Sequence, residues 1–296
     1  MLTVGYIGLG IMGKSIARNI MKAGFPVVVH NRSRAAVQEL VAEGAKESVS
    51  PSEVAALTDV IFTNLPDSPD VEDVVLGKGG VIEAARSGQV YVDNSTIRPS
   101  VARTIAARLL RKGVQALDAP VSGGDIGARD ATLTIMVGGD ADALEKVMPV
   151  FRAMGKTVTH VGAAGAGQVA KAANQIMVAA QMAAMAELLI FSQKAGVAPR
   201  KVVDAIKGGA AQCWTLDVKP QRLFAGNRNP GFKAYMQAKD MNIVMDTARE
   251  YGAPLPSTAT NTQLFQAMLQ MNMADLDNSA IVGVIETLAG VKLSED

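Results

Sequence analysis

The sequence predicts an α/β domain built on a doubly wound, mostly parallel sheet, followed by an all-α domain. Short β-branched segments alternate with amphipathic helical segments up to about residue 162, a pattern typical of βαβ units. We expect the strands at residues 3–7, 26–30, 60–64, 90–94, 114–118, 132–137 and 157–161. Beyond them, long Ala-, Met- and Leu-rich segments have helical spacing. The predicted domains are therefore residues 1–163 and 164–296.

Composition favours a small-molecule partner. The chain has 296 residues, 49% of them hydrophobic, which is enough for two domains with their own cores. Its formal net charge is +1, and acids and bases are scattered, so neither nucleic acid nor an anionic membrane surface is an expected partner.

The few cysteine and histidine residues argue against disulfides and metal sites. The single cysteine, Cys213, excludes an internal disulfide, so we expect a reducing, cytoplasmic setting. The two histidines, His30 and His160, both fall in predicted strands and form no cluster of metal ligands, so no metal is expected. The apolar segment 172–186 is shorter than the roughly 20 residues that cross a membrane, and we predict no membrane span.

A glycine-rich turn predicts a dinucleotide site. Gly8, Gly10 and Gly13 form G-x-G-x-x-G between the first strand and a helix, and a second strand follows at residues 26–30. In a Rossmann-type domain such glycines allow a sharp turn, close approach of the pyrophosphate, and close packing of helix on strand. The helix N-terminus offers free N–H groups to the phosphates. We expect cofactor contacts from the whole turn, which also includes Leu9, Ile11 and Met12.

The end of the second strand indicates which dinucleotide is bound. NAD-specific sites usually place a carboxylate there, but this chain has Asn31, Arg32 and Ser33, followed by Arg34. A guanidinium can pair with a 2′-phosphate, so NADP(H) is favoured and NAD(H) remains possible. The alternative is that the arginines are solvated residues of a helix capped by Asn31 or Ser33.

Two further strands deliver polar or rigid residues to the carboxyl edge of the sheet, where ligands of doubly wound folds collect. Leu65 and Pro66 follow the third strand, and Pro66 is expected to fix a loop against the cofactor. Ser95 and Thr96 follow the fourth strand. They are candidate ligand contacts, although they could equally cap a helix that begins at Pro99.

The segment Ser122-Gly123-Gly124 is a candidate substrate cradle. It follows the fifth strand, and its hydroxyl and exposed N–H groups suit a carboxylate or carbonyl oxygen. It does not match the G-x-S-x-G sequence of serine hydrolases. The alternative is a glycine-rich hairpin that binds no ligand.

Lys171 is the only charged residue between Lys156 and Glu187, in a segment that otherwise predicts a buried helix. Burying an ammonium costs several kcal/mol unless a partner compensates. An ammonium can polarise a carbonyl group and donate a proton to the developing alkoxide, and a desolvated amine can take the proton back. The alternatives are a side chain that reaches solvent from a helix end and a charge paired with a buried acid.

Together these motifs resemble the β-hydroxyacid dehydrogenase family, which includes 3-hydroxyisobutyrate dehydrogenase, tartronate semialdehyde reductase and glyoxylate/succinic semialdehyde reductases. The resemblance covers essentially the whole chain. It rests on four segments in the right order: YIGLGIMGKSIARN, DAPVSGGDIGARDATLTIMVGGD, GAGQVAKAANQ and FKAYMQAKDMNIVMDTA.

The resemblance implies roles for individual residues. Lys171 would be the catalytic acid/base, and Lys239 would close over the cofactor from the helical domain. Thr96 would lie beside both nicotinamide and substrate. The implied substrate contacts are Ser122, Gly123, Gly124, Thr96, Phe232 and Asp240.

One position departs from the family pattern. The family commonly has asparagine four residues after the lysine, whereas this chain has Asn174 at the third position and Gln175 at the fourth. Both lie on the lysine's face of a helix, so either amide is a candidate for orienting substrate. The Asn-Gln pair and the segment LPDSPDVEDVVLGKGGVI resemble the tartronate semialdehyde reductase branch.

The expected activity is therefore NADP(H)-dependent reduction of tartronate semialdehyde to glycerate, in a homodimer or homotetramer. Alternative activities are those of 3-hydroxyisobutyrate dehydrogenase and of glyoxylate/succinic semialdehyde reductase. A catalytically silent dinucleotide-binding protein is a non-enzymatic alternative. A 6-phosphogluconate dehydrogenase is disfavoured, because the chain is too short for that family's larger helical domain.

Overall fold

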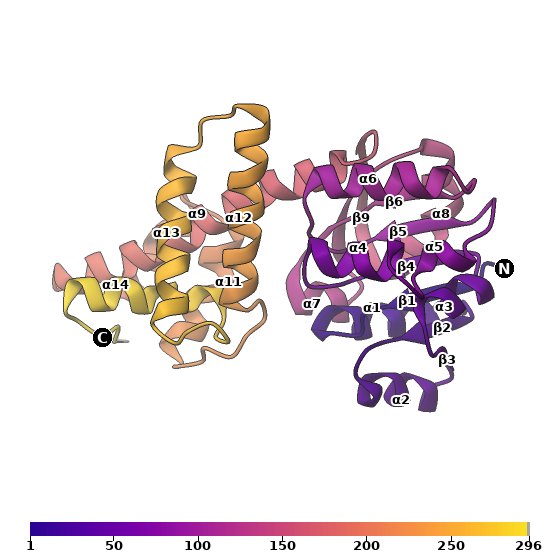
Figure 1. Cartoon of the computed structure of the whole chain (residues 1–296). Coiled ribbons are helices and arrows are strands. Elements are labelled where there is room, and N and C mark those ends of the chain that lie inside the picture. The colour runs from indigo at the N-terminus through magenta and orange to yellow at the C-terminus, as the bar shows by residue number, and fades with distance from the viewer. Residues whose placement is uncertain (295–296) are drawn as a thin grey trace. The chain divides into compact units, whose positions relative to one another are not determined.

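The computed structural model describes residues 1–294, and the chain forms two compact units (Figure 1). The first unit is Met1–Lys171 and the second runs from Ala172 onward. The division thus falls inside a long helix, α9 (Ala166–Lys194), and not at the predicted 163/164. The start of α9 belongs to the first unit because its backbone is hydrogen-bonded to the end of a strand there.

The first unit contains the predicted sheet. Its strand order is β3-β2-β1-β4-β5-β6-β8-β7, and β9 pairs with β8. Neighbours from β3 to β6 are parallel, and β8 runs antiparallel to β6 and β7. The strands are β1 (Val4–Ile7), β2 (Val27–His30), β3 (Lys46–Glu47), β4 (Val60–Thr63), β5 (Val90–Asp93), β6 (Gln115–Asp118), β7 (Val121–Ser122), β8 (Leu133–Gly138) and β9 (Gly155–Gly162).

All seven predicted strands are present, and the predicted fold class is confirmed. The two strands that the sequence did not predict, β3 and β7, have two residues each, too few to show a β pattern. Parallel register brings the last residues of β1, β4, β5 and β6 to one edge of the sheet. The predicted site residues of the first unit lie in segments that follow the ends of β1, β2, β4, β5 and β6. Lys171 is the exception, and it is hydrogen-bonded to the segment that follows β6.

Helices cover both faces of the sheet (Figure 1). They are α1 (Ile11–Lys22), α2 (Arg34–Ala42), α3 (Pro51–Leu57), α4 (Ser68–Leu76), α5 (Val81–Ala84), α6 (Pro99–Leu110), α7 (Gly124–Arg129) and α8 (Ala141–Met154). Successive strand residues point to opposite faces. Tyr6 therefore enters a core under α1 and α8, and its neighbour Ile7 enters a core under α3, α4 and α6.

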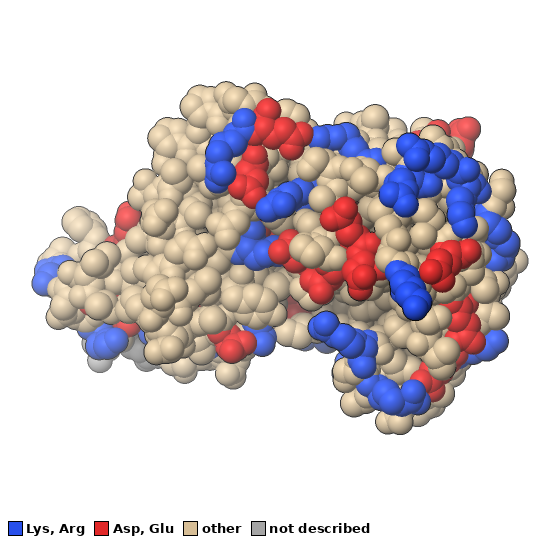
Figure 2. Space-filling model, in the orientation of Figure 1, with Lys and Arg blue, Asp and Glu red and all other residues tan. Residues whose placement is uncertain are grey.

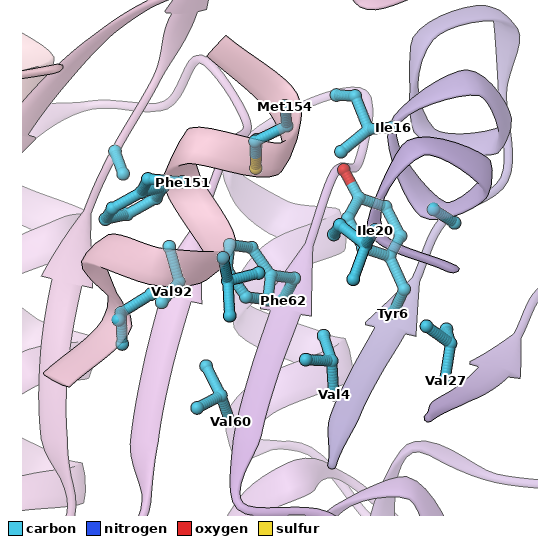
Figure 3. Packing of buried hydrophobic residues seen from close by; sticks show 14 of the residues in the cluster. Val4, Tyr6, Ile16, Ile20, Val27, Val60, Phe62, Val92, Phe151 and Met154 are labelled. Atoms are coloured by element: carbon cyan, nitrogen blue, oxygen red, sulfur yellow. The ribbon is translucent and has the colours of Figure 1, made fainter. Parts of the chain in front are cut away.

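Aromatic rings anchor the core under α1 and α8 (Figure 3). The rings of Tyr6 and Phe62 stack with centroids 5.8 Å apart, and Phe151 of α8 meets Phe62 edge-on at 6.0 Å. Such pairs add to the free energy gained by burying apolar area. They fix β1 and β4, the two strands that precede the glycine-rich turn and the Leu65-Pro66 loop.

The second unit is helical, as predicted. After α9 come α10 (Pro199–Ile206), α11 (Trp214–Phe224), α12 (Ala234–Tyr251), α13 (Pro256–Gln270), the 3-10 helix η1 (Asn278–Ile281) and α14 (Val282–Ala289). Gly252 ends α12 in the left-handed conformation, with φ of 66°. The core of the second unit is rich in methionine and alanine from α9 and α12.

Helix α9 is longer than the apolar segment 172–186, from which no membrane span is predicted. With 29 residues it is long and apolar enough to cross a membrane by length and composition alone, whereas the sequence suggested a shorter apolar segment. Half of its most apolar window is buried inside the protein.

The charged side chains are distributed differently over the two units (Figure 2). On the face shown, acids and bases intermingle over the first unit, and much of the second unit's face is uncharged. Within residues 1–294 no group of three or more His, Cys, Asp or Glu side chains is placed to hold a metal ion.

Candidate functional site

The turn after β1 has three glycines with three different surroundings. Gly8 has φ of 98°, and a Cβ there would overlap the carbonyl oxygen of Asn64. A Cβ on Gly13 would overlap the carbonyl oxygen of Gly8, so α1 packs directly on the turn. A Cβ on Gly10 would meet nothing within 4 Å. Gly10 begins α1 without a side-chain cap, so the open space lies where N–H groups need an acceptor.

Asn31 braces this turn. Its Oδ1 accepts a hydrogen bond from the N–H of Leu9 at 3.0 Å, and its Nδ2 donates to the carbonyl oxygen of Ser33 at 3.1 Å. Ser33 is the N-cap residue of α2, but its side chain makes no capping hydrogen bond. Ser33 is thus the cap residue that the alternative allowed, although neither Ser33 nor Asn31 caps the helix through its side chain.

The two arginines after β2 differ. Arg34 pairs with Glu47 at 2.8 Å on the surface. Arg32 is exposed, and within the described residues it forms no ion pair. Arg32 is thus the guanidinium that remains available beside the Asn31-braced turn.

The loops after β4 and β5 are tied together. Ser95 Oγ accepts a hydrogen bond from the N–H of Leu65 at 2.8 Å, and Asn94 Nδ2 donates to the carbonyl oxygen of Ala119 at 2.7 Å. Helix α6 begins at Pro99 with Arg98 as its N-cap residue, so neither Ser95 nor Thr96 caps it. Pro66 is exposed and Thr96 half-buried, both at the carboxyl edge of the sheet.

The cradle segment has a backbone that requires glycine. Gly123 and Gly124 have φ of 130° and 63°, and a Cβ on Gly124 would meet nothing within 4 Å. Ser122 ends β7, which pairs with β8 antiparallel, and α7 lies between these strands. The two consecutive strands are thus an antiparallel pair, as in the hairpin of the alternative, but the connection between them contains the helix α7.

Lys171 lies next to this segment. Its side chain is buried, with 7% of the residue exposed, so it does not reach solvent from a helix end. Its Nζ donates a hydrogen bond to the carbonyl oxygen of Val121 at 2.7 Å, directly before Ser122. The first unit thus brings together a buried ammonium and the Ser122–Gly124 backbone.

Four of the other predicted residues form a polar network in the second unit. Gln175 Nε2 donates to Asp240 Oδ2 at 2.6 Å, and Asn174 Nδ2 donates to Gln175 Oε1 at 2.8 Å. Lys239 Nζ lies 2.7 Å from Asp240 Oδ1. Phe232 has different partners, because its N–H donates to Asp277 Oδ2 at 3.3 Å.

Two buried residues that sequence reasoning missed also belong to the edge of the sheet in the first unit. Asp118 ends β6, and its carboxylate accepts hydrogen bonds from two N–H groups at the start of α9. The side chain of Gln168 joins α9 to the segment around Thr96. The available signal for Asp118 was an acid that directly ends a predicted strand.

The chain matches two described protein families. Residues 3–162 match the NAD binding domain of 6-phosphogluconate dehydrogenase, and residues 165–285 match the NAD-binding domain of NADP-dependent 3-hydroxyisobutyrate dehydrogenase.

Individual relatives are similar to this chain over nearly their full length. The 2-hydroxy-3-oxopropionate reductase of Escherichia coli K12 is 41% identical over 99% of this chain and 100% of that protein. The solved 3-hydroxyisobutyrate dehydrogenase of Mycobacterium tuberculosis, with L-serine, is 34% identical with a TM-score of 0.88, covering 96% of this chain and 99% of that one. Psf3, solved in complex with NADP+ and 2-OPP, is 25% identical with a TM-score of 0.88, covering 96% and 100%.

Proposed function

The chain belongs to the β-hydroxyacid dehydrogenase family of NAD(P)-dependent oxidoreductases, and from this premise we propose that it reduces a short-chain semialdehyde to a β-hydroxy acid with NADP(H). The substrate we favour is tartronate semialdehyde, which would be reduced to glycerate. Support for this choice comes from the 41% identity to a reductase named for 2-hydroxy-3-oxopropionate, the same compound.

The observation that carries the proposal is the position of Lys171. Its Nζ is held by the carbonyl oxygen of Val121 at 2.7 Å, next to backbone that can receive a carboxylate. An ammonium has three N–H donors, so one can remain on Val121 while another polarises a substrate carbonyl. In reduction, Lys171 Nζ gives its proton to the oxygen that develops negative charge, and in oxidation the amine takes the proton from the hydroxyl group.

The Ser122–Gly124 segment would hold the substrate's carboxylate. Two consecutive glycines with positive φ leave their N–H groups unshielded by side chains, and the Ser122 hydroxyl adds a further donor. A fixed carboxylate would leave the aldehyde carbon of a short semialdehyde within a few bonds of the anchor. The reaction geometry would then be set by this segment and Lys171 together.

The residues of the glycine-rich turn fit a dinucleotide. The uncapped start of α1 and the open space at Gly10 suit a pyrophosphate, while Asn31 holds the turn. When bound, the nicotinamide cofactor supplies the hydride for the carbonyl carbon. Leu65, Pro66 and Thr96 would line its path along the same edge of the sheet.

We propose NADP(H) over NAD(H) on the basis of Arg32. No acid follows β2 to accept the ribose hydroxyls, and Arg32 is exposed beside the turn. A guanidinium recognises a phosphate through two parallel hydrogen bonds. The solved NADP+ complex of Psf3 supports the same choice.

The residues of the second unit keep proposed roles of their own. Gln175 is committed to Asp240 and to Asn174 through its amide, which leaves the half-buried Asn174 as the better candidate for orienting substrate. Lys239 is proposed as a cofactor contact, and Asp240 and Phe232 as substrate contacts.

The proposal is tested by a comparison of substrates. The kcat/KM of the purified protein would be measured for tartronate semialdehyde, glyoxylate, succinic semialdehyde and 3-hydroxyisobutyrate, each with NADP(H) and NAD(H). We expect the highest value with tartronate semialdehyde and NADPH. A preference for 3-hydroxyisobutyrate would move the assignment to the activity named for the Mycobacterium tuberculosis relative. Absence of turnover with all four would refute the proposed reaction.

A cytoplasmic location and a homo-oligomeric state complete the proposal. The single cysteine, Cys213, is free, which suits a reducing compartment. Support for self-association comes from large apolar side chains exposed on the second unit, among them Phe191 and Leu288.

A further inference from the structure

The start of α9 is bound by an acid from the sheet. Asp118, only 5% exposed, accepts hydrogen bonds from the N–H of Gly165 at 2.7 Å through Oδ1 and from the N–H of Gln168 at 2.8 Å through Oδ2. The first N–H groups of a helix have no partner within the helix. A negative charge at this end also interacts favourably with the helix dipole.

Two glycines bring the helix this close to the strands. A Cβ on Gly167 would overlap the carbonyl oxygen of Asp118, and one on Gly138 would lie 2.6 Å from Asp118 Oδ1 and from the N–H nitrogen of Gly167. The start of α9 is therefore held on the ends of β6 and β8 without intervening side chains, and its position along its axis is fixed.

Gln168 extends this anchor to the loop after β5. Its side chain is fully enclosed, with 1% of the residue exposed. Its Oε1 accepts a hydrogen bond from the N–H of Ile97 at 3.1 Å, and its Nε2 donates to the carbonyl oxygen of Ser95 at 2.8 Å. These two bonds bracket Thr96. Lys171 follows Gln168 by three residues on the same helix and reaches Val121.

We propose that Asp118 is a positioning residue for the reaction: it caps α9 from the sheet and, through Gln168, sets Lys171 and Thr96 relative to the Ser122–Gly124 segment. This inference rests on the proposed function, because Lys171 is the proton donor there. No contact of Asp118 itself with the substrate or the cofactor is proposed. Its effect is on the geometry of the groups that do.

The charge of Asp118 gives the proposal a pH signature. Burial raises the pKa of its carboxyl group to about 6, against the lowering effect of the Gly165 and Gln168 N–H groups, and the charge of Asp93 raises the pKa further. Below about pH 6 the carboxyl group takes up a proton and one oxygen ceases to be a good acceptor. Three further titratable or charged side chains lie on elements packed near it: Tyr91 on β5, Arg103 on α6 and Lys171 on α9.

The decisive variant is Asp118→Asn, which keeps the shape but offers an NH2 group to one of the two N–H donors. We expect kcat at pH 7.5 to fall about 10- to 100-fold, the cost of a small misplacement of a reacting group. The KM for the cofactor should change much less than kcat, because Thr96 is the one proposed cofactor contact that depends on Asp118 and the glycine-rich turn is untouched. The wild-type kcat should decline below about pH 6, and this decline should be absent from the variant.

Two further variants separate positioning from general destabilisation. Gln168→Leu removes the bonds around Thr96 but keeps Asp118, so kcat should fall while the acid decline remains. Asp140→Asn removes a cap of another helix, α8, where Asp140 Oδ1 accepts from the N–H of Ala143 at 3.0 Å. Its kcat and pH profile should match the wild type. Should Asp118→Asn fail to fold, Gln168→Leu carries the kinetic test.

Hydrogen exchange gives a readout that needs no turnover. The amide protons of Gly165 and Gln168 should lose protection in Asp118→Asn but not in Asp140→Asn. A wild-type protein without turnover would refute the proposed function, and exchange would still test the cap. Two results would overturn the inference. One is that Asp118→Asn keeps the wild-type kcat together with the decline of kcat below about pH 6. The other is that the Gly165 and Gln168 amide protons keep their protection from exchange in this variant.

Discussion

At the scale of single residues, the structure distinguishes side chains that are equivalent in the sequence. Arg32 and Arg34 both follow β2, yet Arg34 is engaged by Glu47 and Arg32 forms no ion pair within residues 1–294. Asn174 and Gln175 are both amides after Lys171, yet only Gln175 donates to a buried acid. These differences depend on contacts from distant segments, which a single sequence does not reveal.

The arginines provide a prediction about cofactor preference. Arg32→Ala should raise the KM for NADPH about 10- to 100-fold, because hydrogen bonds to a charged group are worth roughly 1.5–3 kcal/mol. The KM for NADH should change little, since that cofactor lacks the 2′-phosphate. Arg34→Ala is the matched control and should leave both values near wild type. Equal effects of the two substitutions would argue against a specific role of Arg32.

At the scale of elements, the sequence predicts the helices and strands that are long enough to show a periodic pattern of apolar residues. Segments such as 3–7 and 60–64 are β-branched, and their strands are present. β3 and β7 were missed because two residues carry no alternation. The predicted domain boundary followed the loss of strand signal, but the hydrogen bonds of Asp118 hold the start of α9 in the first unit.

The candidate site was predictable to a similar extent. Gly8, Gly10, Gly13 and Lys171 were identified because glycine spacing and an isolated charge are visible in the sequence. The cap from Asp118 was not, because it joins residues almost 50 positions apart and depends on the register of two strands with α9. Contacts between distant segments also distinguish Phe232 from Asp240. Both have the same predicted role as substrate contacts, whereas their hydrogen-bond partners differ.

An ion pair inside the second unit gives a prediction about the stability of its elements. Lys219 of α11 pairs with Asp277 before η1 at 2.7 Å, and both side chains are buried. Burial would raise the pKa of Asp277, but Lys219, the Ser279 hydroxyl and the Gly231 N–H together hold it below the usual value. Asp277 also accepts from the N–H of Phe232, so the pair supports the segment that carries this residue.

Lys219→Met should therefore destabilise the protein by about 3–5 kcal/mol, because it leaves a buried carboxylate without its counter-charge. Lys233→Met is the matched control, since the Lys233–Asp275 pair at 2.8 Å is largely exposed and should contribute at most about 1 kcal/mol. Urea unfolding at neutral pH measures both. The same loss of stability in the two variants would contradict this reading of the pair.

At the scale of the whole molecule, the surface of the second unit supports the proposed self-association. Phe191 of α9 and Leu288 of α14 are 74% and 75% exposed, unusual values for large apolar side chains. The ends of these two helices are joined, because Lys194 Nζ donates to the carbonyl oxygen of Ala289 at 3.3 Å. The face of this unit in Figure 2 also carries few charges.

The double variant Phe191→Ser/Leu288→Ser should therefore have a smaller molar mass in solution than the wild type, measured by light scattering during size-exclusion chromatography. Its circular dichroism spectrum should stay unchanged, because neither side chain belongs to a core. A control variant, Val49→Ser, removes an exposed apolar side chain from the first unit and should keep the wild-type mass. A monomeric wild-type protein would contradict the proposed oligomer.

The central claim for the molecule as a whole is that Lys171 transfers the proton in an NADP(H)-dependent reduction. The most direct test measures kcat and cofactor affinity for Lys171→Ala, beside Lys194→Ala at the other end of the same helix. We predict that Lys171→Ala loses at least about 100-fold in kcat, within the range of general acid catalysis, while its Kd for NADPH in a fluorescence titration stays within about twofold. Lys194→Ala should resemble the wild type. Turnover by Lys171→Ala at the wild-type rate would contradict the claim.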